Sequence, residues 1–258
     1  MPPAEPSAEP DAVPADHGSA ERSGTQRPDS RADGSTGVED TLDLELTEEL
    51  LALIAGERSP GAAGARVTHE LLGDPGAWPP TTTAAGEFAL VPVRPERDLA
   101  VVSRWMNDPA VAAFWELAGP ESVTADHLRA QLEGDGRSIP CLGVLDSTPM
   151  SYWEIYRADL DPLARHYPAR PHDTGVHLLI GGVINRGRGV GTALLRAVAD
   201  LVLDNLPRCG RVVAEPDLRN TPSVSAFLSA GFRFSAEVDL PDKRAALMIR
   251  DRTYRAQL

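Results

Sequence analysis

A strand-like segment that leads into a glycine-rich turn and then a long helix constrains the fold more than any other feature of this chain. The strand reads Gly175-Val-His-Leu-Leu-Ile-Gly181, and the turn reads Arg186-Gly-Arg-Gly-Val-Gly-Thr192. Glycines let anionic groups approach the backbone, and the start of a helix offers free N–H groups. The apolar residues after the turn recur at the spacing of one helix face: Leu194, Leu195, Val198, Leu201 and Val202. The sequence therefore predicts an anion site between a strand and a helix.

The turn differs from the two common nucleotide-binding loops. It lacks the Lys-Ser/Thr ending of an ATP-binding P-loop, and it is not a G-x-G-x-x-G turn in the first βα unit of the chain. It matches Arg-x-x-Gly-x-Gly, with Arg186, Gly189 and Gly191 in register. Taken alone, this pattern fits a tight surface turn with solvated arginines equally well, so the surrounding sequence must decide between the two interpretations.

Composition and charge divide the 258 residues into three parts. Residues 1–40 are rich in Pro, Ala, Gly, Ser and Asp, and they are predicted to form a disordered acidic tail. Residues 41–86 are predicted to hold a short amphipathic helix and then a linker rich in Pro, Gly and Thr. Residues 87–258 have the size and apolar content of a single domain.

Segments of strand and helix character alternate within residues 87–258, which predicts an α/β or α+β fold with a mixed sheet. Asp98 and Thr124 are expected to cap two helices, and residues 146–149 are expected to form the turn of a β-hairpin. Farther along, a strand over 211–214 precedes a helix that begins at Asn220.

The composition of the whole chain disfavours several classes of function. No apolar run has the length of a transmembrane helix, and residues 1–40 contain no apolar core of a signal peptide. The net charge of −13 disfavours nucleic acid and membrane surfaces as partners. Cys141 and Cys209 are too few for a disulfide framework, so a cytoplasmic protein is expected. His172 and His177 would face opposite sides of one strand, so no metal site is expected.

The order of elements around the turn resembles the GNAT superfamily of acyl-coenzyme A N-acyltransferases. The resemblance rests on the strand, the Arg-x-x-Gly-x-Gly turn, the helix, the Asn220-led helix and its Gly231-Phe232 ending, and it covers about residues 87–258. It implies a mixed, mostly antiparallel sheet flanked by helices, with an acyl-coenzyme A such as acetyl- or succinyl-coenzyme A as co-substrate. Phe227 stands where many members have a tyrosine that protonates the leaving thiolate, so no general acid is assigned.

In this superfamily the loop amides bind the coenzyme pyrophosphate, and the preceding strand pairs its edge with the pantetheine arm. The resemblance therefore implies a set of coenzyme-binding residues in the strand, the turn and the second helix. These are Leu179, Ile180, Gly181, Arg186, Gly187, Arg188, Gly189, Val190, Gly191, Thr192 and Asn220.

Further motifs are similar to the branch of the superfamily that makes hydroxamate siderophores. They read Trp105-Met-Asn-Asp-Pro109, Met150-Ser-Tyr-Trp-Glu-Ile-Tyr156, His172-Asp-Thr-Gly-Val-His177 and Glu215-Pro-Asp-Leu-Arg-Asn220. This branch acylates N-hydroxylated diamines, lysine or ornithine, and the wording is most similar to the desferrioxamine-pathway acyltransferases of N-hydroxycadaverine. The resemblance implies that His177 and Asp217 are catalytic.

The residue types suit these roles. A neutral imidazole at His177, with an ordinary pKa of about 6.5, is expected to act as general base, with Asp217 orienting it or holding the substrate hydroxyl. Glu215 shares a strand face with Asp217 and is the alternative carboxylate. Three aromatic residues are expected to line a slot for the aliphatic acceptor, with Glu154 near its distal ammonium: Trp115, Trp153 and Tyr156. An aromatic core with one exposed acid explains the same four residues.

Two other functions remain open from the sequence. One is a GNAT acetyltransferase that acts on another amine, with aminoglycoside 6′-type enzymes as the model. The other is a non-catalytic acyl-coenzyme A binder that uses the acidic N-terminal segment for interaction.

Overall fold

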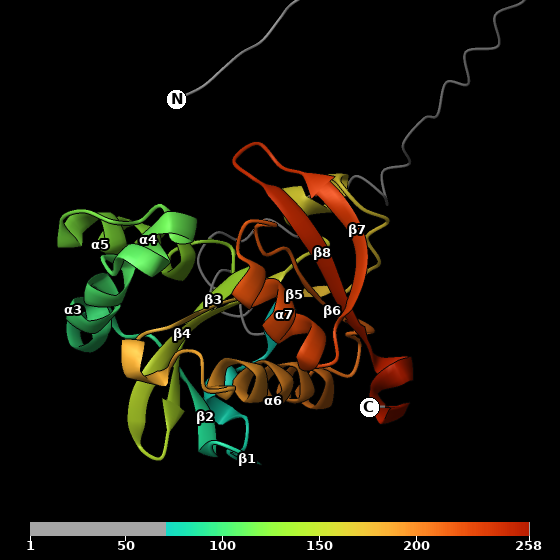
Figure 1. Cartoon of the computed structure of the whole chain (residues 1–258), viewed down its shortest axis with the longest axis horizontal. Coiled ribbons are helices and arrows are strands. Elements are labelled where there is room, and N and C mark those ends of the chain that lie inside the picture. Colours follow the sequence, from blue (N-terminus) through green and yellow to red (C-terminus); the bar gives the residue numbers. More distant parts are fainter. Residues whose placement is uncertain (1–70, 258) are drawn as a thin grey trace, which may run out of the picture. The chain divides into compact units, whose positions relative to one another are not determined.

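The structure is a computed structural model that describes residues 71–257 (Figure 1). Its helices and strands are η1 (Pro75–Ala77), β1 (Thr81–Thr83), β2 (Gly86–Pro92), α3 (Pro95–Met106), α4 (Pro109–Trp115), α5 (Glu121–Leu132), β3 (Ser138–Leu145), β4 (Thr148–Arg157), η2 (Pro162–Arg165), β5 (Thr174–Ile180), η3 (Val183–Asn185), α6 (Val190–Asn205), β6 (Arg211–Ala214), α7 (Thr221–Ser229), β7 (Arg233–Asp239), β8 (Arg244–Asp251) and η4 (Arg252–Gln257). None of these helices is long and apolar enough to cross a membrane.

The strands form one mixed sheet of eight strands in the order β1-β2-β3-β4-β5-β6-β8-β7. All neighbours are antiparallel except β5 and β6. This parallel pair meets only through Thr174 opposite Val212 and Gly175 opposite Val213. Beyond Gly175 the two strands part, so β5 has a free backbone edge there. The predicted fold class, a mixed and mostly antiparallel sheet flanked by helices, is confirmed.

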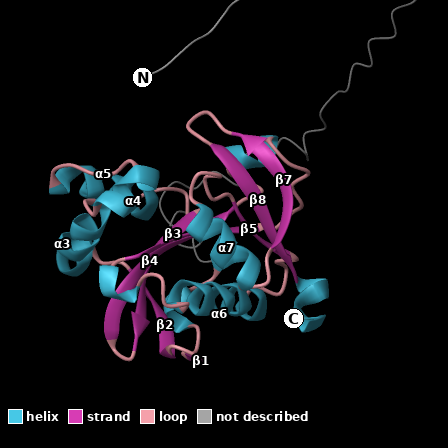
Figure 2. Ribbon diagram, in the orientation of Figure 1, coloured by secondary structure: helices cyan, strands magenta, loops and turns pink. Residues whose placement is uncertain are grey.

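Helices cover both faces of the sheet (Figure 2). The long helix α6 and the neighbouring α7 pack on one face through a core that includes Trp153, Leu194 and Phe227. Helices α3 to α5 pack on the other face around Tyr152 and Trp105. Because both faces are buried, the central strand β4 is apolar on both sides, as strands between two helical layers usually are.

Local signals set several of these elements. Asp146 and Ser147 both adopt left-handed φ angles, 45° and 65°, which fit a two-residue hairpin between β3 and β4, so the predicted hairpin is confirmed. Asp98 lies inside α3 and accepts a hydrogen bond from the backbone N–H of Arg94 at 2.8 Å, rather than capping the helix as predicted. Thr124 is likewise buried inside α5, because the helix is capped at Pro120 and starts at Glu121, four residues earlier than a cap at Thr124 predicts.

The predicted disordered tail (1–40) and the helix expected before residue 58 lie outside the described residues. Within residues 41–86, predicted to hold a short helix and then a linker, the structure has η1 and β1. Thr81, Thr82 and Thr83 pair with β2, as β-branched residues readily do, and Leu72 and Trp78 are buried in the core under α6. The sheet therefore begins six residues before the predicted boundary at Glu87.

Candidate active site

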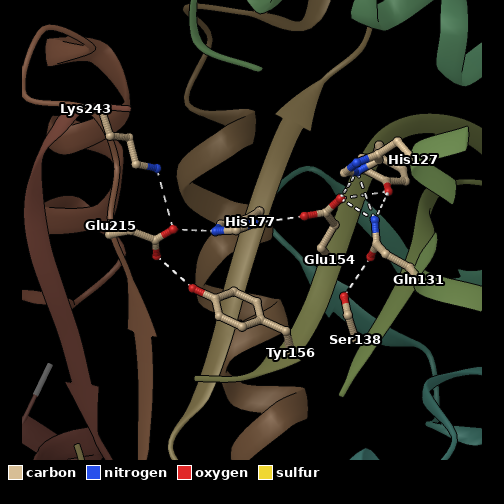
Figure 3. Close-up of polar contacts among 9 residues, drawn as sticks. His127, Gln131, Ser138, Glu154, Tyr156, His177, Glu215 and Lys243 are labelled. Atoms are coloured by element: carbon tan, nitrogen blue, oxygen red, sulfur yellow. Dashed lines mark hydrogen bonds and ion pairs between the residues drawn. The ribbon is translucent and has the colours of Figure 1, made fainter. Parts of the chain in front are cut away.

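His177 lies between two glutamates at the centre of the sheet (Figure 3). The register of β4 and β5 places Glu154 directly opposite His177, with both side chains on one face. The His177 Nδ1 atom is 2.8 Å from Glu154 Oε2, and its Nε2 atom is 2.5 Å from Glu215 Oε1. Glu215 follows directly after β6, which lies beside β5. The splayed strands thus bring together two acids and one imidazole from three separate segments.

Glu154 is enclosed by neutral and ionisable partners. Its Oε1 atom lies 2.6 Å from His127 Nε2, accepts a hydrogen bond from Gln131 at 2.7 Å, and accepts another from the Tyr152 hydroxyl at 3.0 Å. Both His127 and Gln131 come from α5. Binding a distal ammonium, the role predicted for Glu154, would compete with these contacts.

Glu215 is held in the same way on the other side of His177. Its Oε2 atom accepts a hydrogen bond from the Tyr156 hydroxyl at 2.8 Å, and Lys243 Nζ lies 3.5 Å from its Oε1 atom. The groups from His127 through Glu154, His177 and Glu215 to Lys243 form a continuous row across the sheet, which we call the acid–histidine row (Figure 3).

The charges within the row set its protonation state. Burial alone would lower the pKa of His177 and raise the pKa of both carboxyls. The two glutamates outweigh burial and raise the pKa of His177 to about 10. The same contacts lower the pKa of Glu215 to about 2 and hold the pKa of Glu154 well below its usual range. Two carboxylates facing the two ring nitrogens favour the imidazolium form of His177, whereas the sequence predicted a neutral imidazole base.

A glycine missed by the sequence analysis makes room for this arrangement. The ring of Tyr156 packs against His177 with 4.7 Å between centroids. Gly175 lies opposite Tyr156 in the β4–β5 register, and a Cβ atom at Gly175 would overlap the tyrosine ring. A glycine inside a strand often marks a close approach of another group, so Gly175 could have indicated this contact from the sequence.

A cavity of about 340 Å³ opens beside His177, whose side chain is 35% exposed. Its walls include Trp115, Glu154, Glu215 and Lys243. The Trp115 ring lies edge-on to His177 at 6.1 Å, as its predicted place in the acceptor slot requires. Trp153 does not reach this cavity, because alternation along β4 points it into the core under α6. The predicted aromatic slot is thus corrected at Trp153, and Tyr156 lies beneath His177.

Asp217 also lines this cavity, but it does not touch His177. Its carboxylate accepts hydrogen bonds from the backbone N–H of Arg219 at 2.7 Å and from the Arg219 guanidinium at 2.6 Å. This is the local turn that Asp commonly forms with a backbone N–H two residues on. Glu215, the alternative carboxylate in the sequence analysis, is the one that contacts His177.

A second cavity of about 780 Å³ runs along the glycine-rich turn, the free edge of β5, α4 and α7. Gly187 and Gly189 adopt φ angles of 70° and 78°, which favour glycine. The first intrahelical bond of α6 runs from Ala193 to the Gly189 carbonyl, so the N–H groups of Val190, Gly191 and Thr192 have no acceptor within the helix. This is the geometry predicted for an anion site.

The free edge of β5 borders the same cavity. The Gly181 N–H donates to the Met150 carbonyl at 2.8 Å, on the side facing β4. Because successive residues of a strand direct their backbone groups to opposite sides, those of Leu178 and Ile180 face the open edge. Leu178, Leu179 and Ile180 all line the cavity, in agreement with the predicted position of the strand.

Arg186 lines the larger cavity, and its guanidinium is also held by neighbouring groups of the protein. Its guanidinium donates to the carbonyls of Ile180 and Gly181 and forms an ion pair with Asp108 at 2.8 Å. Asp108 also caps α4 through the N–H of Ala110. Arg186 thus ties β5 to α4 and shapes the cavity, whereas Arg188 is exposed on the turn.

Asn220 borders both cavities. Its side-chain oxygen accepts a hydrogen bond from the Ser223 N–H at 3.2 Å and so caps α7. Phe227, the residue without a hydroxyl, packs edge-on against Phe232 and lines the smaller cavity.

Removal of the Arg186 side chain is expected to destabilise the protein measurably. Arg186→Ala leaves Asp108 and two strand-end carbonyls without their donor, which should cost about 1–3 kcal/mol in the free energy of unfolding. Urea unfolding of the purified variant measures this. Arg129→Ala removes an exposed ion pair with Asp126 and serves as the control, with an expected change below about 0.5 kcal/mol. Equal stability of the two variants would contradict the bridging role.

Comparisons with known proteins identify the family of this fold. Residues 94–240 match the model of the acetyltransferase (GNAT) domain. The lysine N-acyltransferase MbtK of Mycobacterium sp. (strain MCS) is 37% identical over 175 residues, which are 68% of this chain and 71% of that protein. The N(6)-hydroxylysine O-acetyltransferase of Escherichia coli is 39% identical over 61% of this chain and 50% of that protein.

Solved structures of other proteins share the fold. An uncharacterized protein from Bacillus halodurans superposes with a TM-score of 0.64 at 31% identity, over 70% of this chain and 94% of that chain. The aminoglycoside acetyltransferase AAC(6')-Ib, in complex with coenzyme A, shares the fold with a TM-score of 0.58 at 23% identity, over 66% and 98% of the two chains. The protein is thus an acyltransferase. It belongs to the GNAT family.

Proposed function

We propose that this enzyme transfers an acyl group from acyl-coenzyme A to the hydroxylamine nitrogen of an N-hydroxylated lysine or ornithine, or of a diamine such as N-hydroxycadaverine. The product is a hydroxamate of the kind found in siderophores. The observation that carries the proposal is the junction of the two cavities, which share walls at Trp115, Leu178 and Asn220. A thioester in the larger cavity then meets an acceptor in the smaller one beside His177.

The larger cavity suits coenzyme A. The free N–H groups of Val190, Gly191 and Thr192 at the positive end of α6 would bind the pyrophosphate. The open backbone edge at Leu178 and the N–H of Ile180 would pair with the amides of the pantetheine arm, whereas the Ile180 carbonyl already accepts a hydrogen bond from Arg186. Either acetyl- or succinyl-coenzyme A can serve as donor in this arrangement.

The smaller cavity suits a nucleophile that is already neutral. An alkylamine has a pKa of about 10.4, so only about one molecule in a thousand is unprotonated near pH 7.4. Each carboxylate of the site, Glu154, Glu215 and Asp217, pairs with His177 or Arg219, and this contact lowers its pKa, so it is a poor base towards an ammonium. A hydroxylamine is much less basic and needs no such step. Relatives named for lysine, N(6)-hydroxylysine and N(5)-hydroxyornithine support this class of acceptor.

A panel of acceptors tests the proposal. N-hydroxycadaverine, N(6)-hydroxylysine and N(5)-hydroxyornithine are each compared with the parent amine and with an aminoglycoside, using acetyl- and succinyl-coenzyme A at pH 7.4. We expect thiol release to be at least about a hundredfold faster with a hydroxylamine, following the difference in unprotonated nucleophile. The product should give the colour of an iron(III) hydroxamate, which an O-acylated hydroxylamine does not form.

Three outcomes would contradict the proposal. Equal or faster turnover of a parent amine or an aminoglycoside would assign the enzyme to amine acetylation. Thiol release without iron(III) colour would assign acylation to oxygen. Absence of turnover with every acceptor and both donors would favour a binding role.

A further inference from the structure

Lys243 is the one lysine in the sequence, in which every other basic side chain apart from the histidines is an arginine. It lies between β7 and β8, and its side chain is 22% exposed. It lines the smaller cavity, and it also lines an adjacent hollow of about 50 Å³ together with Trp115 and Arg219. A largely enclosed ammonium group therefore borders the space in which the acceptor is proposed to bind.

Backbone pairing holds Lys243 at this place. The segment that follows β6 runs beside the start of β8. The Leu218 N–H donates to the Arg244 carbonyl at 3.0 Å, and the Ala246 N–H donates to the Pro216 carbonyl at 2.9 Å. These hydrogen bonds join the residues after Lys243 to the loop that lines the smaller cavity, so the position of its ammonium does not depend on a loose loop.

The Lys243 ammonium has N–H donors to spare. Its Nζ atom lies 3.5 Å from Glu215 Oε1, and the same oxygen is 2.5 Å from His177 Nε2. Within residues 71–257, this ion pair is the one polar contact that the ammonium makes. An ammonium offers three donors, so an anion in the cavity can bind to Lys243 without displacing a protein group.

The other basic side chains near this space already have carboxylate partners. His127 and His177 both contact Glu154. Arg219, at the adjacent hollow, pairs with a carboxylate at 2.6 Å, and its side chain is 73% exposed. Among the described residues that line the smaller cavity, Lys243 is thus the cation best placed to bind an anionic group of a ligand.

We propose that Lys243 binds a carboxylate carried by one of the two reactants and so makes the enzyme selective for that reactant. This proposal rests on the proposed acyl transfer. The carboxylate has two possible sources. One is the terminal carboxylate of a succinyl donor, and the other is the α-carboxylate of an amino-acid acceptor such as N(6)-hydroxylysine. Acetyl-coenzyme A and N-hydroxycadaverine lack this group, so each source has a matched reactant without it.

Both carboxylates can reach Lys243 from the reacting centre. The contacts through Glu215, of 2.5 Å and 3.5 Å, place Lys243 Nζ within about 6 Å of His177 Nε2. With bonds of about 1.5 Å, an extended succinyl group spans about 4 Å from the thioester carbon to the carboxylate carbon. An extended N(6)-hydroxylysine spans about 7.5 Å from the hydroxylamine nitrogen to its carboxylate carbon. Both lengths are comparable with the distance across the cavity wall.

The surrounding charges make Lys243 necessary for such binding. Glu215 and Asp217 also line the cavity, and each is a carboxylate with a cationic partner. Without the ammonium, a carboxylate of a reactant would face these like charges in a space partly closed to water, where repulsion is weakly screened. Loss of Lys243 should therefore act on carboxylate-bearing reactants above all.

Selectivity ratios of Lys243→Met test the proposal. Wild type and variant are assayed with acetyl- and succinyl-coenzyme A, each combined with N-hydroxycadaverine and with N(6)-hydroxylysine. The ratio of kcat/KM for the carboxylate-bearing reactant to that for its matched reactant should fall about 10–100-fold in the variant, as expected for loss of a charge-assisted hydrogen bond. A change in the donor ratio identifies succinyl as the source, and a change in the acceptor ratio identifies the amino acid. Effects on the rate that are common to all reactants cancel in these ratios.

Two further variants separate the charge from other consequences of the substitution. Lys243→Arg keeps the positive charge and should retain most of the wild-type selectivity. Arg244→Met removes the neighbouring cation, which is exposed and pairs with Glu237, and should leave both ratios unchanged. Unchanged ratios in Lys243→Met, or a wild-type preference for the pair of reactants without a carboxylate, would overturn the proposal.

NMR of the single lysine provides a measurement that needs no turnover. Protein grown with ¹³C-labelled lysine carries the label at Lys243 alone. Its ¹³Cε resonance should shift with succinyl-coenzyme A more than with acetyl-coenzyme A, or with N(6)-hydroxylysine more than with N-hydroxycadaverine. Each reactant is added by itself, so these spectra report on carboxylate binding even if the proposed acyl transfer fails. Equal shifts within both matched pairs would show that Lys243 does not recognise a carboxylate.

Discussion

Gly189→Val is expected to abolish detectable coenzyme A binding while the protein remains folded. Gly189 has a φ angle of 78°, which a β-branched residue adopts only with strain, so the turn would have to rearrange. That rearrangement displaces the N–H groups of Val190, Gly191 and Thr192, which are positioned for the pyrophosphate. A Cβ atom at Gly189 meets no atom within 4 Å, so the variant loses the turn geometry without a clash in the core.

Calorimetric titration with coenzyme A measures this effect, and circular dichroism verifies the fold. Gly191→Val separates bulk from backbone strain, because Gly191 lies in α6 with an ordinary helical φ, and its Cβ would meet Ile180 at 3.7 Å. It should also prevent binding, through a side chain next to the proposed phosphate position. Gly210→Ala, in open space outside the cavity, is the control and should bind normally. Normal binding by both turn variants would refute the placement of coenzyme A.

The parts of the molecule that could be predicted from sequence are those set by neighbours in the chain. The turn after β5, the hairpin at Asp146 and Ser147, and the Asn220 cap each depend on a few consecutive residues. Each contains a residue type with a specific backbone preference, so the local sequence is enough to predict the local backbone conformation. The predicted strand over 211–214 agrees with β6 for the same reason.

The acid–histidine row depends instead on strand register. Glu154 and Glu215 lie 23 and 38 residues from His177, and only the pairing of β4 with β5 and the position of the end of β6 bring them together. Side chains alternate between the two faces of β4, but residues 150–156 are buried on both faces, so their pattern does not show which face carries the site. Trp153 therefore lies on the face opposite the one predicted for it.

The side chains of Asp217 and Arg186 contact neighbouring polar groups that the sequence pattern did not indicate. Asp217 and Glu215 are two residues apart and line one cavity, yet the turn to Arg219 holds Asp217 away from His177. Arg186 carries a charge typical of a phosphate ligand, but two strand-end carbonyls and Asp108 hold it. In both positions a nearby polar partner determines where the side chain lies.

Replacement of His177 should cause the largest loss of turnover of any single change in the smaller cavity. His177→Ala leaves the buried carboxylates of Glu154 and Glu215 without the cation between them, so the pKa of each should rise toward or above its usual range. The smaller cavity then loses both its imidazole and the negative charge of the two carboxylates beside it. We expect kcat to fall by about 10²–10⁴, with coenzyme A affinity within about threefold of wild type, because His177 lies outside the larger cavity.

The positive charge of His177 should also stabilise the folded protein. The pH dependence of the melting temperature measures this charge independently of turnover. The pKa of His177 is about 6.5 in the unfolded chain and about 10 in the folded protein, so its charged contacts stabilise the fold fully below pH 6.5 and lose that contribution as the pH rises toward 10. The difference in melting temperature between wild type and His177→Ala should therefore shrink from pH 6.5 to pH 10. His166→Ala, at an exposed position after η2, is the control and should change neither kcat nor that pH dependence. Near-wild-type kcat in His177→Ala would remove the imidazolium from the mechanism, and a melting difference independent of pH would show that His177 is not charged in the folded protein.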